Sequence, residues 1–158
     1  NPDYLIVDTP GQIELFAYRQ SGPFFVNEFV AEEKMNLFLF DGTMVSSPSN
    51  FVSLTLLSTS IRLRLGLPTV NVITKTDLIQ EKLEKVLSWS GTDSQLEADL
   101  AGELNGDTFS LVSDMLSSLN RHDFQQDLIP VSNLTGDGMV SLQSALSRTI
   151  NLGEELED

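Results

Sequence analysis

The sequence contains no cysteine, which excludes disulfide bonds and thiolate metal sites and is typical of a cytoplasmic protein. No apolar run reaches the ~18 consecutive residues that a membrane-spanning helix requires, and no secretory signal pattern opens the chain. We therefore expect a cytoplasmic protein without a membrane partner.

Basic side chains are also scarce, with 9 Lys and Arg against 23 Asp and Glu, for a formal net charge of −14. Such a surface repels the phosphates of nucleic acids and anionic lipids, so we expect no nucleic-acid partner. A single nucleotide is not excluded. Backbone amides, one lysine and Mg²⁺ hold phosphates even in an acidic protein.

Strands and helices alternate along the chain. Continuous apolar runs bounded by turn residues predict buried strands at 4–7, 36–40, 69–74 and 128–132. Helical periodicity and end signals predict helices at 13–20, 24–34, 48–65, 79–87, 109–119 and 139–150, with a short one within 88–106. This order predicts an α/β fold, a three-layer α/β/α domain with a mostly parallel sheet.

The length of 158 residues suits a single domain. The segment from about 80 to 124 is too long for a simple crossover, so we expect a helical insertion on one edge. An acidic tail occupies 153–158.

Three motifs each follow an apolar strand: DTPGQ (8–12), TKTD (74–77) and VSNLTGDG (131–138). The carboxyl ends of parallel strands share one edge of a sheet, which is where such folds bind ligands. Each motif alone is weak evidence, because Asp-x-x-Gly is frequent by chance and TKTD also suits a turn that caps the following helix. Their order and strand context together predict one site.

The first and second motifs suit opposite ends of a nucleotide. Asp8 is placed to hold a hydrated Mg²⁺, and the amide of Gly11 to meet a terminal phosphate. Asp77 offers two acceptors to the N1 hydrogen and exocyclic amine of guanine, a donor pair that adenine lacks. The aliphatic stem of Lys75 would lie along the base.

The third motif completes the base site. Backbone amides around Ser132 and Asn133 are placed to meet the guanine O6, a contact that the amine of adenine would repel. The sequence therefore favours guanine over adenine.

Nearly the whole chain resembles the GPN-loop GTPases, and most closely their archaeal branch. The resemblance rests on DTPGQIELFAYRQSG, on FLFD followed by SPSNFVSLTLLS, and on LPTVNVITKTDL, EKVLSW and IPVSNLTGDGM. It implies a P-loop fold that binds GTP with Mg²⁺, hydrolyses GTP, and works as a homodimer in which a Gly-Pro-Asn loop reaches the partner's nucleotide.

The resemblance also assigns residue roles. It gives Asp8 to Mg²⁺ through water, Gly11 to the γ-phosphate and Gln12 to the attacking water. Glu14 either orients water or the partner's loop, or is a solvated carboxylate at a helix start. Lys75 and Asp77 recognise the base.

Two departures from the family pattern matter. Thr74 replaces a frequent asparagine, and its hydroxyl is still able to bridge neighbouring loops. No G-x-x-x-x-G-K-[ST] phosphate loop and no Gly-Pro-Asn occurs in the 158 residues. In the family both precede the first strand, so we expect a carboxyl-terminal fragment that is inactive in isolation.

Two other functions remain open. The chain could be a non-catalytic interaction module that keeps the base-binding half of a GTPase, or part of a related P-loop ATPase. Asp77 after a lysine argues against the ATPase.

Overall fold

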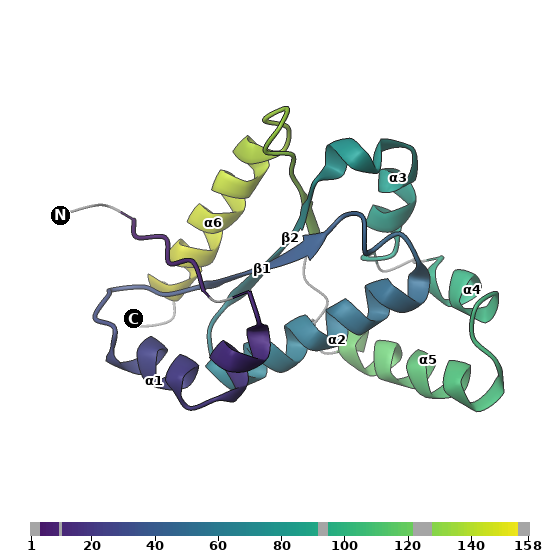
Figure 1. Cartoon of the computed structure of the whole chain (residues 1–158), viewed down its shortest axis with the longest axis horizontal. Helices are drawn as coiled ribbons and strands as arrows, with labels where there is room; N and C mark the ends of the chain where they lie inside the picture. Colours follow the sequence, from purple (N-terminus) through teal and green to yellow (C-terminus); the bar gives the residue numbers. More distant parts are fainter. Residues whose placement is uncertain (1–3, 10, 92–94, 122–127, 155–158) are drawn as a thin grey trace.

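The structure, a computed structural model, describes residues 4–9, 11–91, 95–121 and 128–154 (Figure 1). Its sheet consists of parallel strands β1 (Asn36–Asp41), β2 (Thr69–Thr74) and β3 (Leu128–Pro130), in that order. The central strand β2 is buried throughout except at its last residue. The strands predicted at 36–40, 69–74 and 128–132 are confirmed, although the third ends two residues early.

Helices cover both faces of the sheet, which confirms the predicted three-layer α/β/α fold. Phe38 and Phe40 of β1 join the core on the face of α2 (Pro48–Leu65). Val70 and Val72 of β2 pack with Ala145 on the other face, which α6 (Met139–Glu154) covers. Figure 1 shows α2 and α6 on opposite sides of the strands. This division follows from the alternation of side chains along a strand.

Helix α2 begins and ends where local chemistry predicts. The Ser47 hydroxyl accepts a hydrogen bond from the amide of Asn50, and Pro48 occupies the first helical position. Gly66 ends the helix with φ of 68°, a conformation that favours glycine. These end signals are confirmed.

The connection between β2 and β3 is helical. It contains a 3₁₀ turn, η2 (Thr76–Leu78), and the helices α3 (Gln80–Ser88), α4 (Leu96–Ala101) and α5 (Gly106–Arg121). Figure 1 shows α4 and α5 beside one end of α2. Residues 92–94 and 122–127 of this connection, and 155–158 of the acidic tail, lie outside the described residues. That this region is an insertion stays a prediction.

Trp89 gives the EKVLSW stretch a structural role. The indole is 1% exposed, packs on Phe51 and donates to Asp99 at 2.8 Å. Lys85 pairs with the same carboxylate at 3.1 Å. The indole hydrogen bond and then Lys85 lower the pKa of Asp99. Helices α3 and α4 are thereby joined.

The expected strand at Tyr4–Val7 is wrong. These four side chains are 47–87% exposed, and the backbone forms no strand. A continuous apolar run becomes a buried strand only where a neighbouring strand pairs with its backbone and layers cover both faces. Within the described residues, β1 pairs with β2 alone and Tyr4–Val7 pairs with neither.

The amino-terminal helices also differ from expectation. The helix predicted at 13–20 is a π-helical turn, η1 (Glu14–Tyr18), and the one predicted at 24–34 is α1 (Ser21–Glu28). Gly22 and Pro23, which usually interrupt helices, lie in the first turn of α1. Proline is tolerated there because the first amides of a helix need no intrahelical partner.

Candidate guanine-recognition site

The TKTD and VSN loops lie side by side at the carboxyl edge of the sheet. Pairing between the two segments continues past the end of β3, because the amide of Val131 donates to the carbonyl of Ile73 at 2.8 Å. The amide of Thr76 then donates to the carbonyl of Val131 at 3.3 Å. The expectation that these two motifs converge is confirmed.

Asp77 is fixed by the second of these loops. The Ser132 hydroxyl donates to Asp77 Oδ1 at 2.6 Å and accepts a hydrogen bond from the amide of Thr135. Ser132 is only 1% exposed, so water does not compete for its hydroxyl. The hydrogen bond sets the direction of the Asp77 carboxylate before any ligand binds.

One part of the expected base contact requires correction. The amide of Ser132 donates to the carbonyl of Asp137 at 3.0 Å, so it is not free to meet a guanine oxygen. The side chain of Ser132 instead donates to Asp77. Asn133 is exposed in the same loop, and its amide contact with guanine stays a prediction.

The structure also excludes the capping role for Asp77. Helix α3 has Ile79 at its N-cap, without a side-chain capping bond, and Asp77 lies inside η2. The carboxylate is directed to Ser132 rather than to the start of α3.

Gly138 closes the VSN loop. Its φ is 79°, and a Cβ at this position would lie 1.8 Å from the carbonyl oxygen of Pro130. Only glycine permits both this conformation and this approach. The loop that presents Ser132 therefore turns back tightly against β3.

Lys75 has a left-handed backbone, with φ of 57° and ψ of 36°, and is the one non-glycine residue with positive φ in the described part of the chain. Such strain is frequent at functional sites. Its ammonium lies 2.6 Å from Asp41 Oδ2. The sequence alone does not single out Asp41 as a site residue. Asp41 directly follows the predicted strand 36–40 and Thr74 ends the predicted strand 69–74, which was the available indication that the two lie close together. In the structure they are register partners.

Thr74 connects β2 to β1. Its hydroxyl donates to the carbonyl of Phe40 at 3.2 Å, and the amide of Gly42 donates to the carbonyl of Thr74 at 3.0 Å. The hydroxyl therefore bridges to the neighbouring strand end, close to the bridging role predicted for it.

The predicted phosphate-binding residues are not joined to this group. Asp8, Gly11 and Gln12 are exposed and precede η1. Among the described residues, no hydrogen bond or ion pair joins Asp8, Gly11 or Gln12 to the two loops. Glu14 begins η1, and its side chain lies outside the described part. The DTPGQ motif thus does not converge with TKTD and VSN, because the strand expected to carry it, residues 4–7, is unpaired.

Acidic side chains form no ready-made metal site in the described part of the chain. No group of three acidic or histidine side chains suited to a metal occurs in the described chain. Mg²⁺ normally keeps several waters and takes one or two carboxylates together with substrate phosphates. The single exposed carboxylate of Asp8 fits that mode of binding.

Comparison with known proteins decides the family. The family model described as "Conserved hypothetical ATP binding protein" matches residues 1–152. GPN-loop GTPase 1 of Saccharomyces cerevisiae is 30% identical over an alignment of 156 positions, which covers 92% of this chain and 40% of that protein. GPN-loop GTPase QQT2 of Arabidopsis thaliana is 31% identical over 140 residues, 87% of this chain and 36% of that protein. The chain belongs to the GPN-loop GTPase family.

A solved structure agrees with the fold of this GPN-loop family member. The crystal structure of an apo-form GTPase from Pyrococcus abyssi aligns with a TM-score of 0.77 and 21% identity, over 90% of this chain and 56% of that one. The chain spans about two fifths of the two curated GPN-loop relatives above. Among the residues that the structure describes, no helix has the length and apolar character to cross a membrane.

Proposed function

We propose that this chain supplies the guanine-recognising part of a GTPase that binds GTP with Mg²⁺ and hydrolyses it. The observation that carries the proposal is the 2.6 Å hydrogen bond from Ser132 to Asp77. It presents a fixed carboxylate at the end of β2, and guanine offers two donors to such a group. Adenine offers no such pair, so we favour GTP although the matching family model is described as ATP-binding.

The base contacts divide among three residues. Asp77 accepts from the guanine N1–H and amine, the stem of Lys75 lies along the ring, and the amide of Asn133 donates to O6. Ser132 and Thr74 hold the two loops in place through their hydroxyls.

The phosphate end is assigned by the family resemblance. Asp8 would hold Mg²⁺, which when bound neutralises charge on the phosphates. The amide of Gly11 donates to the γ-phosphate, Gln12 orients the attacking water, and Glu14 supports that water or the partner's loop. The homodimer and the cytoplasmic setting belong to the same proposal.

The affinities of the full-length product of the gene for GTP, GDP and ATP test this function. We expect tight guanine nucleotide binding, weak ATP binding, and Mg²⁺-dependent release of phosphate from GTP. Guanine binding without phosphate release would support the non-catalytic module instead, and ATP preference would support the ATPase.

Ser132→Ala in the same protein should lower GTP affinity about 10- to 100-fold, because a hydrogen bond to a charged group contributes about 1.5–3 kcal/mol. ATP affinity should stay weak and unchanged. Ser144→Ala is the matched control, since that exposed hydroxyl bonds only the carbonyl of Val140 within α6. An equal loss in both variants would contradict the role of Ser132.

A further inference from the structure

Both oxygens of the Asp41 carboxylate accept hydrogen bonds. Its Oδ2 accepts from the ammonium of Lys75 at 2.6 Å, and its Oδ1 accepts from the amide of Thr43 at 2.9 Å and from the Thr43 hydroxyl at 2.7 Å. Lys75 and then the Thr43 hydroxyl lower the pKa of Asp41 to about 2. In the folded protein this carboxylate loses its charge only as pH falls through about that value, so the pair is present throughout the neutral range.

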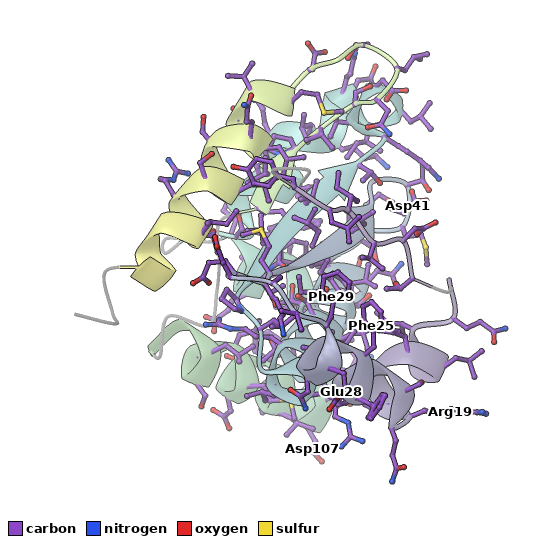
Figure 2. The ribbon with its side chains drawn as sticks, turned by 90° about the vertical axis from the view of Figure 1, so that its left-hand side faces the viewer. Arg19, Phe25, Glu28, Phe29, Asp41 and Asp107 are labelled. Carbon is purple, nitrogen blue, oxygen red and sulfur yellow. The ribbon has the colours of Figure 1, made fainter. Side chains whose placement is uncertain are left out.

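The turn that begins at Asp41 packs directly against the TKTD loop. The amide of Gly42 donates to the carbonyl of Thr74 at 3.0 Å, and a Cβ on Gly42 would lie 2.6 Å from that oxygen. Figure 2 shows Asp41 on the right-hand side, above Phe25, Phe29 and Arg19. The ion pair thus belongs to the edge of the sheet that carries the base-recognition loops.

Stability does not explain this pair. The Lys75 side chain is 57% exposed and that of Asp41 29%, and exposed ion pairs contribute little to folding. The pair does restrict where the lysine stem lies. A free lysine samples many rotamers, and that freedom would be lost each time a base was bound against it. The left-handed backbone of Lys75 also supports a fixed position for the stem, because it sets the direction of the Cα–Cβ bond.

We propose that Asp41 is a positioning residue for nucleotide binding: it holds the ammonium of Lys75 so that the aliphatic stem stands ready as one wall of the guanine site. This role rests on the proposed function and extends it to a residue outside the TKTD and VSN motifs. Asp41 does not touch the base. It acts through Lys75.

Asp41→Asn in the full-length protein tests the role. The asparagine keeps an oxygen for Thr43, while its amide replaces the oxygen that binds the lysine. We expect GDP affinity, measured by calorimetry without Mg²⁺, to fall about tenfold as the lysine regains its freedom. Thr43→Val is the matched control, because it removes one bond to the same carboxylate and leaves the ion pair intact. Its GDP affinity should stay within about twofold of the wild type, less than the loss of one neutral hydrogen bond usually causes.

A double-mutant cycle separates positioning from a general structural effect. Lys75→Met keeps the apolar stem and removes the ammonium, so Asp41→Asn should have no further effect in that background. Multiplying losses in the double variant would overturn the proposal, as would unchanged GDP affinity in Asp41→Asn alone. Thermal unfolding of each variant identifies losses that come from misfolding.

A second readout needs no nucleotide. The rate at which acetic anhydride modifies Lys75, followed by mass spectrometry, should rise several-fold in Asp41→Asn and stay unchanged in Thr43→Val. Equal rates in wild type and Asp41→Asn would show that the ion pair does not hold the lysine. If the wild-type protein binds no guanine nucleotide, the proposed function fails and the positioning role with it. Normal wild-type binding with no effect of Asp41→Asn rejects the positioning role alone.

Discussion

Asp77→Asn in the full-length protein is expected to weaken GTP binding about 30- to 1,000-fold and to strengthen XTP binding, with ATP weak before and after the change. The Ser132 hydroxyl holds Oδ1 of the side chain, so the new amide replaces the other oxygen and faces the base. There it confronts the guanine amine as a second donor. Xanthine carries an oxygen in place of that amine, and the new amide donates to it.

The three nucleotide affinities, measured before and after the substitution, check this result. Asp114→Asn provides the control, because it makes the same chemical change on an exposed position of α5. An unchanged ratio of GTP to XTP affinity would contradict base recognition by Asp77.

Gln12→Ala is expected to slow GTP hydrolysis about a hundredfold while GTP affinity stays nearly unchanged. A side chain that only orients the attacking water acts in the transition state, so its loss appears in turnover. The backbone turn should survive, because it is the carbonyl of Gln12 that accepts from the amide of Leu15. The side chain itself is exposed.

Single-turnover phosphate release and equilibrium GTP binding measure the two effects separately. Gln20→Ala, at an exposed glutamine without a side-chain capping bond before α1, is the control. Equal losses of affinity and rate would mean that Gln12 supports structure. An unchanged rate would mean that other groups position the water without it.

The local parts of the fold were predictable from sequence. The ends of α2 depend on Ser47, Pro48 and Gly66, whose effects act within a few residues. Strands β1 and β2 are apolar runs that the sheet does bury on at least one face. The convergence of TKTD with VSN also follows, because carboxyl ends of parallel strands meet at one edge.

Non-local contacts were not predictable. Tyr4–Val7 has the composition of a strand, yet strand formation depends on a pairing partner that composition does not specify. The hydrogen bond between Ser132 and Asp77 joins side chains 55 positions apart, and the pair of Lys75 with Asp41 spans 34. The fold of the VSN loop decides which atom of Ser132 is available, because the amide of Ser132 already donates to the carbonyl of Asp137.

The central place of β2 has a consequence for amide hydrogen exchange. This strand pairs with β1 on one side and with β3 on the other, so its amides should exchange at the rate of global unfolding. The exposed amides of Tyr4–Val7 should exchange within the earliest time points. Because TKTD begins at the last residue of β2, the backbone hydrogen bonds at the start of this motif should stay formed while less stable segments of the chain unfold locally and refold.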